Sequence, residues 1–322
     1  MPADKPPGTS VRPNEFSEIA RLFRPLTGGA PGAFDLLDDA AVVPQRPGFD
    51  LVITNDAVVA GVHFPIGERP DLIARKLVRV NLSDLAAKAA EPFACFLAVA
   101  WPSAFGPRER QAFAAGLGED LKAFGVSLLG GDTVSTPGPL TASLTALGWV
   151  PQGQMVRRAG AKVGDVIAVS GTIGDGTLGL AAVRGEVEDP DGWLASRYRL
   201  PTPRLDLREA LRTRAHAAAD VSDGLIADAG HIAEASGVGL ILDLDALLLS
   251  RAARVWLSAQ SDRAAALIRL ATGGDDYEVV CAVSGDVPGG FTAIGCLVAG
   301  NEVDVRVDGR RVEIAQRGWT HL

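Results

Sequence analysis

Residues 71–90, DLIARKLVRVNLSDLAAKAA, decide the fold of this chain. Five of them recur at the spacing of one helix face: Leu72, Ile73, Lys76, Leu77 and Val80. The stretch therefore predicts a helix that covers one face of a sheet. Asn81 and Asp84 share a face of this helix, and Ser83 adds a hydroxyl nearby. Asp84 is then either a metal ligand, which the alanine-rich surroundings favour, or the partner of Lys88 in a surface ion pair.

Strands are predicted on both sides of this helix. Short apolar runs lie at 51–54, 94–100, 126–129 and 141–148. A second helix is predicted over 109–124, where large apolar residues repeat at helical spacing. Each helix can cover one sheet face, so the first half is a mixed α/β unit.

The pattern breaks near residue 150, and a new strand is expected at 166–169 after a turn. We therefore expect two domains, 1–150 and 151–322. The second half predicts helices near 177–184, 205–213, 225–236 and 263–270, with strands near 240–243, 278–283 and 303–307. Because strands and helices alternate, the fold class is α/β or α+β.

Composition excludes several classes of function. The net charge of −8 argues against general nucleic-acid binding, which needs concentrated basic residues. The longest apolar stretch, 93–101, is far shorter than the roughly 20 residues of a membrane span. The start lacks the pattern of an export signal, so we expect a cytoplasmic protein. No lysine follows a glycine, which excludes a Walker A loop. The three widely spaced cysteines suggest buried free thiols.

Aspartates recur at the edges of apolar runs along the whole chain. They lie in the segments 37–40, 54–56, 81–84, 130–133, 220–224 and 273–277. A carboxylate is costly to bury alone, so their repetition suggests that a shared group of cations neutralises them. Metal-dependent chemistry is therefore the leading interpretation. For any one of these residues taken alone, a turn is the simpler explanation.

Two glycine-rich segments are candidate phosphate sites. Gly130-Gly131-Asp132-Thr133 follows a predicted strand, and paired glycines let the backbone bend closely around an anion beside a metal held by Asp132. A simple Gly-Gly turn is the alternative. Residues 171–176, GTIGDG, look like a phosphate loop, but we interpret them as a strand-to-helix turn.

The segment Asp220-Val221-Ser222-Asp223-Gly224 precedes a predicted helix, where Ser or Asp commonly caps the free amides. Capping explains one of these side chains but not three oxygen-bearing residues within four positions. We therefore assign Asp220 and Asp223 to metal and Ser222 to nucleotide. The segment Asp275-Asp276-Tyr277 is either a turn or a site where a carboxylate, beside an aromatic ring, recognises an amine. His63 and Trp319 taken alone are compatible with ordinary packing.

In order along the chain, these segments resemble the thiamine-monophosphate kinase family of the aminoimidazole-ribonucleotide-synthetase-like superfamily. The resemblance runs from about residue 15 to the C-terminus. It is carried by 38–41, Asp56 with 61–64, 80–87, 130–133, 158–162 with 164–165, 222–225 and 276–278.

The resemblance implies transfer of phosphate from ATP to thiamine monophosphate with several Mg²⁺ ions. By matching positions, the metal ligands would be Asp39, Thr54, Asn55, Asp56, Asp84, Asp132, Asp220 and Asp223. The ATP contacts would be Gly131, Asp132, Arg158 and Ser222, and the thiamine phosphate contacts would be His63, Asp275 and Trp319. The carboxylates of Asp84, Asp132 and Asp223 would be catalytic.

The resemblance also implies a homodimer in which the N-terminal sheets of two subunits join, with ATP near their interface. Several positions depart from the family pattern. Leu37 replaces a glycine, Asn55 a threonine, and Asp275 a common glutamate, while Lys88-Ala89, Thr320 and Leu322 also differ from the usual residues. An uncharged amide at Asn55 would weaken one metal contact. No departure removes a principal carboxylate.

If the acceptor is a phosphate monoester, the reaction needs metal-binding carboxylates more than it needs an activated nucleophile. The second pKa of a phosphate monoester is about 6, so its attacking oxygen is already largely ionised at neutral pH. Bringing two polyanions into line is then the difficulty, and Mg²⁺ relieves it. We therefore expect direct transfer without a phosphoenzyme.

Two rival functions remain. One is another ATP-dependent synthetase of the superfamily. The absence of any cysteine before Cys95 disfavours the selenium enzyme, which uses an early Cys or selenocysteine. The other is a catalytically silent nucleotide-binding protein.

Overall fold

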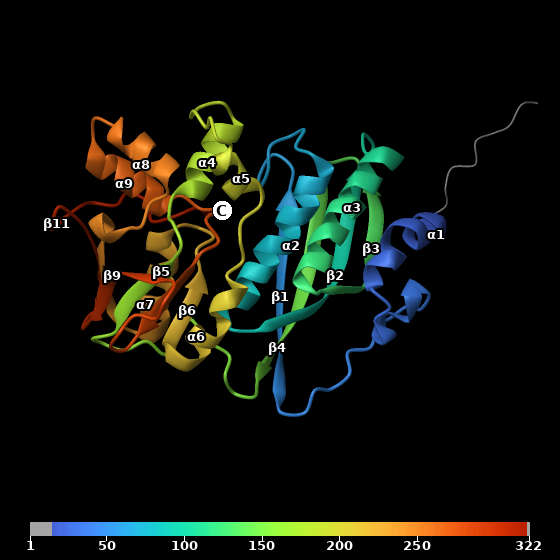
Figure 1. The fold of residues 1–322 in the computed structure, drawn as a ribbon, viewed down its shortest axis with the longest axis horizontal. Helices are drawn as coiled ribbons and strands as arrows, with labels where there is room; N and C mark the ends of the chain where they lie inside the picture. Colours follow the sequence, from blue (N-terminus) through green and yellow to red (C-terminus); the bar gives the residue numbers. More distant parts are fainter. Residues whose placement is uncertain (1–14, 321–322) are drawn as a thin grey trace, which may run out of the picture.

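The computed structural model describes residues 15–320, which form two domains lying side by side, each built on one sheet with covering helices (Figure 1). Before the first strand the chain makes short turns of helix: α1 (Glu15–Glu18), η1 (Ile19–Phe23), η2 (Arg24–Thr27) and η3 (Pro31–Leu36). These turns pack near the outer end of the first sheet, beside β3. No helix within 15–320 combines the length and apolarity of a membrane span.

The first sheet has four strands: β1 (Phe49–Val59), β2 (Glu91–Pro102), β3 (Ser127–Thr136) and β4 (Thr141–Pro151). Their order is β1-β4-β2-β3, with β2 and β3 parallel and the other pairs antiparallel. β1 and β3 are therefore the two edges of the sheet. All four strands were predicted, but three of them are clearly longer than their apolar runs.

Helices α2 (Pro70–Ala87) and α3 (Pro107–Phe124) cover one face of this sheet, as their periodicity predicts (Figure 1). Side chains of β1 alternate because successive residues of a strand point to opposite faces. Val52 and Val58 are buried under α2, whereas Leu51 and Ile53 on the other face are exposed. The first domain thus leaves apolar side chains of β1 exposed on the other sheet face within one chain.

The second sheet has seven strands in the order β11-β10-β7-β9-β5-β8-β6. Their bounds are β5 (Val166–Ser170), β6 (Ala215–Asp220), β7 (Gly239–Asp243), β8 (Val279–Val283), β9 (Phe291–Val298), β10 (Val303–Val307) and β11 (Arg310–Arg311). The helices are α4 (Asp175–Val183), α5 (Trp193–Arg199), α6 (Arg208–Arg214), α7 (Leu225–Ser236), α8 (Arg251–Ser258) and α9 (Arg263–Thr272), with short 3-10 turns η4 (Leu205–Leu207) and η5 (Leu244–Ala246).

Several of these elements were not predicted. β6 reads AHAAAD, and alanine is a weak strand former, so its burial in the sheet overrides its propensity. β9 contains a glycine where its backbone lies against Ile241, which interrupts the usual strand pattern. The short helices α5 and α8 are amphipathic over only two turns and lack a long periodic signal.

Helix α2 also joins the two domains. Its Ser83 hydroxyl donates to the Asp220 carboxylate at the end of β6 at 3.0 Å, and Lys88 Nζ donates to the Ala218 carbonyl at 2.8 Å. Arg79 Nη1 donates to the Pro201 carbonyl at 3.1 Å. One face of α2 therefore completes the first core while another lies against the second domain.

Candidate active site

A cluster of acidic side chains forms where α2 meets both sheets. Asp56 lies on β1, Asp84 on α2, Asp220 at the end of β6, and Asp223 in the loop that follows. The Thr54 hydroxyl, on the same face of β1 as Asp56, donates to Asp84. Five of the predicted metal ligands are therefore brought together from segments up to 169 positions apart (223 − 54).

Burial and mutual repulsion make the ionised form of these carboxylates unfavourable. Burial raises the pKa of Asp56 to about 6, with further increases from the charges of Asp84 and Asp223. Burial also holds the pKa of Asp220 well above its usual value, with Asp84, Asp228 and Asp56 adding to the effect. The cluster is thus a site where negative charge is costly and where a cation would relieve the cost.

Helix α2 positions this cluster through polar residues on its buried face. Asn81 Oδ1 accepts the Asp56 amide at 3.0 Å, while its Nδ2 donates to the Leu77 carbonyl at 2.9 Å. The alternative pairing of Asp84 with Lys88 is wrong, because Lys88 turns away to the Ala218 carbonyl. Asp84 instead faces Thr54 across the space between helix and strand.

The loop 220–224 is held by a residue that the sequence interpretation missed. Asp228, in the first turn of α7, accepts the amides of Ser222, Asp223 and Gly224 through Oδ2 at 3.1, 3.1 and 3.2 Å. Burial and the charge of Asp223 raise the pKa of Asp228 to about 7. The expectation that a side chain of the loop itself caps the helix is therefore wrong. An acid four residues after Gly224 was the available signal.

Two of the three predicted acceptor residues, Asp275 and Trp319, are bonded to the loop 220–224. The Asp275 amide donates to the Ser222 carbonyl at 2.9 Å, and the Trp319 amide donates to the Asp223 carbonyl at 2.8 Å. The Trp319 side chain is 57% exposed, so ordinary core packing does not describe it. His63 Nδ1 accepts the Val59 amide at 3.1 Å, which leaves the proton of the neutral imidazole on Nε2.

Arg158 is exposed and lies on the segment between β4 and β5, which connects the two sheets. The positive charge of Arg158 lowers the pKa of Asp228, which partly offsets the increase caused by burial. The same charge also lowers the pKa of Lys88. A cation therefore stands at the border of the acidic cluster. This position suits the predicted contact with a nucleotide phosphate.

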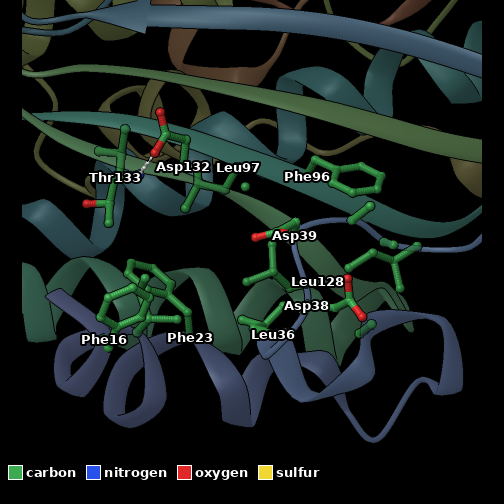
Figure 2. Close-up of a pocket in the computed structure, with 18 residues that line it drawn as sticks. Phe16, Phe23, Leu36, Asp38, Asp39, Phe96, Leu97, Leu128, Asp132 and Thr133 are labelled. Carbon is green, nitrogen blue, oxygen red and sulfur yellow. Dashed lines mark hydrogen bonds between the residues drawn. The ribbon is translucent and has the colours of Figure 1, made fainter.

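A second group of predicted residues lies at the other edge of the first sheet. Asp39, Gly131 and Asp132 line a cavity of about 490 Å³ between β3 and the N-terminal helical turns (Figure 2). Phe23, Leu36 and Phe96 are among its apolar lining residues. Within one chain this cavity is separated from the Asp56 edge by two strands, or about 14 Å of sheet width.

The glycine pair in this second group is not a bend. Gly130-Gly131-Asp132-Thr133 lies within β3, which continues to Thr136, so both the predicted phosphate-cradling bend and the Gly-Gly turn are wrong. A Cβ on Gly131 would lie 1.8 Å from the Leu97 carbonyl oxygen of β2. The glycine is therefore required where the two strands approach closely beside a β-bulge.

Asn55 joins neither group within the chain. Because it alternates with Thr54 and Asp56 on β1, its side chain lies on the uncovered sheet face. Its Nδ2 donates to Ser143 Oγ at 3.0 Å and to Thr145 Oγ1 at 2.8 Å on β4. The structure thus places this predicted ligand away from the acidic cluster.

The turn at 171–176 lies between β5 and α4, as predicted. The amides of Gly174 and Gly176 both donate to the Asp276 carboxylate at 2.8 Å. Burial raises the pKa of Asp276 to about 8, against the opposing effect of these hydrogen bonds. Because an internal carboxylate already occupies the start of α4, this loop is not a phosphate site.

The acidic cluster has the donor chemistry that Mg²⁺ needs. Its oxygens come from Asp56, Asp84, Asp220, Asp223 and Thr54, and hard divalent ions prefer such oxygens. Among residues 15–320, no three His, Cys, Asp or Glu side chains are already grouped as the ligand shell of a single ion. The donor types and their mutual repulsion therefore fit the metal, while the chain alone shows no finished coordination geometry.

Comparison with known proteins places most of this chain in one group. The family model described as AIR synthase related protein, N-terminal domain, matches residues 37–150, and the model of the corresponding C-terminal domain matches residues 162–308. A curated thiamine-monophosphate kinase from Caulobacter vibrioides is 56% identical over 320 residues, covering 96% of this chain and 91% of that protein.

Two solved structures agree with this match. The crystal structure of thiamine-monophosphate kinase from Stenotrophomonas maltophilia K279a has a TM-score of 0.75 at 38% identity, covering 86% of this chain and 91% of that one. The structure "AaThiL complexed with AMPPCP and TMP" has a TM-score of 0.78 at 27% identity, covering 91% of this chain and 98% of that one.

Proposed function

Because this chain belongs to the thiamine-monophosphate kinase family of AIR synthase related proteins, we propose that it uses its acidic cluster to transfer the ATP γ-phosphoryl group directly to thiamine monophosphate. The overall reaction is that of an ATP-dependent thiamine-phosphate kinase, which produces thiamine diphosphate. The observation that carries the proposed role of the cluster is the convergence of Asp56, Asp84, Asp220 and Asp223.

The cluster would hold Mg²⁺ through these four carboxylates and Thr54. When bound, the ions would supply positive charge that stabilises the transferring phosphoryl group. Two observations support this role: burial, with a further contribution from neighbouring carboxylates, raises the pKa of Asp56 and also the pKa of Asp220. Asp84 and Asp223 of this cluster, together with Asp132, are the proposed catalytic carboxylates.

The nucleotide and the acceptor would approach the cluster from its two sides. Ser222, within the loop 220–224, and Arg158, whose charge acts on Asp228, would contact the ATP phosphates. His63, Asp275 and Trp319 would bind thiamine monophosphate, with the exposed indole offering a stacking surface and Asp275 accepting from the ligand. A relative complexed with AMPPCP and TMP supports this pair of ligands.

The chain's residues would position rather than activate the nucleophile. The acceptor phosphate is already largely ionised near neutral pH, so no strong general base is needed. Cys95 and Cys281 are buried, and burial raises the pKa of each thiol to about 12, which makes them poor nucleophiles. We therefore propose in-line transfer without a phosphoenzyme, and a labelled phosphoprotein trapped during turnover would contradict this step.

We also propose a homodimer that completes the site. Asp39, Gly131 and Asp132 lie at the β3 edge, whereas Asp56 and Thr54 lie at the β1 edge. If the β3 edge of one protomer meets the β1 edge of its partner, the two groups of predicted ligands come together. The uncovered apolar face with Leu51, Ile53 and Val134 supports such an association of sheets.

The direct test is to incubate the protein with ATP, Mg²⁺ and thiamine monophosphate and to follow the formation of thiamine diphosphate. Product that requires all three components is the expected result. Omitting Mg²⁺ tests the metal requirement separately. Hydrolysis of ATP without formation of thiamine diphosphate would favour a different acceptor, and binding of ATP without turnover would favour a silent nucleotide-binding protein.

A further inference from the structure

Lys76 is a buried lysine in the middle of α2, where the sequence pattern places it among apolar residues. It is 4% exposed. Its Nζ lies 2.7 Å from Asp275 Oδ1 and 3.3 Å from the His63 carbonyl oxygen, and it lies 3.6 Å from the centre of the Tyr198 ring. A buried ammonium needs such partners, because an isolated charge is costly away from water.

The partners of Lys76 come from three separate elements. His63 belongs to the turn between β1 and α2, Tyr198 to α5, and Asp275 to the loop between α9 and β8. The Tyr198 hydroxyl also donates to the His63 carbonyl at 3.0 Å. Lys76 thus connects the two domains at the point where two of the proposed acceptor residues lie.

The backbone around Asp275 has an unusual conformation that its contacts help to maintain. Asp275 has φ of +70° and Tyr277 has φ of +51°, a left-handed conformation that residues other than glycine rarely adopt. The Asp275 amide is held by the Ser222 carbonyl, and its carboxylate is held by Lys76. Non-glycine residues in this conformation cluster at functional sites, where surrounding contacts maintain them.

The contact also determines what Asp275 offers to a ligand. Lys76 bonds Oδ1, while 28% of the Asp275 side chain is exposed. The Lys76 ammonium therefore neutralises the Asp275 carboxylate and orients it before the ligand binds. It can accept a hydrogen bond in a fixed direction, which reduces the ordering required on binding.

We propose that Lys76 is a positioning residue for the acceptor site, which fixes the Asp275 carboxylate and the His63 turn relative to each other across the domain boundary. This inference rests on the proposed function, since it concerns affinity for thiamine monophosphate. Lys76 itself acts through its neighbours. Its removal should weaken acceptor binding while the ATP side of the site is unchanged.

The test is titration calorimetry of the full-length protein with thiamine monophosphate, comparing wild type with Lys76→Met and Lys76→Gln. We expect the Kd to rise at least about 10-fold in both, the size of effect that loss of an orienting partner has at other sites. In turnover assays the acceptor KM should rise in parallel, while the KM for ATP stays within about 2-fold. Melting curves identify folded variants, and Lys76→Gln is the milder change if Lys76→Met does not fold.

Arg199→Met is the matched control. Arg199 Nε bonds Glu68 Oε2 at 2.7 Å, so this variant also removes an ion pair between the second domain and the loop before α2, without removing a contact to His63 or Asp275. Its Kd for thiamine monophosphate should stay near that of wild type. An equal loss in Arg199→Met would overturn the proposal, because general loosening of the domains would then explain both results.

A double-mutant cycle with Asp275→Asn tests whether Lys76 acts through Asp275. Adding Lys76→Met to Asp275→Asn should weaken binding much less than Lys76→Met alone. Full additivity, or an unchanged Kd in a folded Lys76 variant, would overturn the inference while leaving the kinase function standing. If wild type neither binds nor phosphorylates thiamine monophosphate, the proposed function and this inference both fail.

Discussion

The Ser83 hydroxyl of α2 donates a 3.0 Å hydrogen bond to the Asp220 carboxylate, joining residues 137 positions apart in the sequence. Both side chains are buried. The bond therefore ties the helix of the first domain to the end of strand β6 in the second. Burial raises the pKa of Asp220, and this hydrogen bond lowers it. The bond therefore favours the ionised carboxylate, which is the form that binds a metal ion.

Ser83→Ala should destabilise the protein, because Asp220 loses a buried donor. Leaving a buried acceptor without its partner should lower the free energy of unfolding by roughly 1–3 kcal/mol. Urea unfolding without metal measures this loss. Mg²⁺ should also protect the variant less than wild type. Ser258→Ala, at an exposed position of α8, is the control. An unchanged midpoint in Ser83→Ala would mean that this bond contributes little.

Asp84→Asn should reduce Mg²⁺-dependent turnover by at least about 100-fold, which is typical of removing one charge-stabilising group from an active site. The fold should remain, because asparagine has nearly the same shape and can still accept from Thr54. Asp71→Asn on the same helix, where the carboxylate pairs with Arg69 at the surface, should have little effect. Near-normal turnover of Asp84→Asn at limiting Mg²⁺ would contradict the metal assignment.

Trp319→Ala should mainly raise the KM for thiamine monophosphate, since an exposed ring beside Asp223 is removed without opening a core cavity. Loss of one ring contact corresponds to about 1–3 kcal/mol, or roughly 5-fold to 150-fold in KM. Trp319→Tyr keeps an aromatic face and should stay near wild type. Equal KM values in all three proteins would remove Trp319 from the acceptor site.

Mixing two inactive variants tests the proposed dimer. In a mixed dimer of Asp132→Asn and Asp84→Asn, one of the two sites would contain both wild-type carboxylates if Asp132 acts across the interface. Random exchange of subunits should then restore about a quarter of wild-type activity, since half of the dimers are mixed. Each variant alone is the control. If the exchanged mixture stays inactive, both carboxylates act within one chain or the protein does not pair in this way.

The stability of the metal-free protein should depend on pH through Asp276. Its pKa is about 8 in the folded state against 3.8 in the unfolded chain, so the folded state binds the proton more tightly. The stabilisation is complete below pH 3.8 and is lost as the pH rises to about 8. Between these values the slope approaches 1.4 kcal/mol per pH unit.

Comparing Asp276→Asn with wild type isolates this contribution, because the asparagine does not titrate. The variant should lose less stability than wild type between pH 5 and 8, whatever its absolute stability, as measured by urea unfolding at each pH. Asp191→Asn, an exposed position, should keep the wild-type dependence. Parallel curves for wild type and Asp276→Asn would show that Asp276 titrates in the folded state much as it does in the unfolded chain.

Local patterns in the sequence determined the main elements and the chemistry. The apolar period of 71–90 predicts α2, and that of 225–236 predicts the bounds of α7, because a helix buries one face at a spacing that sequence alone reveals. The repeated aspartates indicate an oxygen-rich cation site, since few other environments make such residues favourable near a core. The order of the motifs indicates the family.

Only the tertiary structure decided which of these residues meet. It brings Thr54, Asp56, Asp84, Asp220 and Asp223 together, yet it places Asp39 and Asp132 at the opposite sheet edge, because strand order is fixed by non-local pairing. It also turns Asn55 to the other face and continues β3 through Gly130 and Gly131. Long-range pairing and burial decide these positions, and neither leaves a mark in a short stretch of sequence.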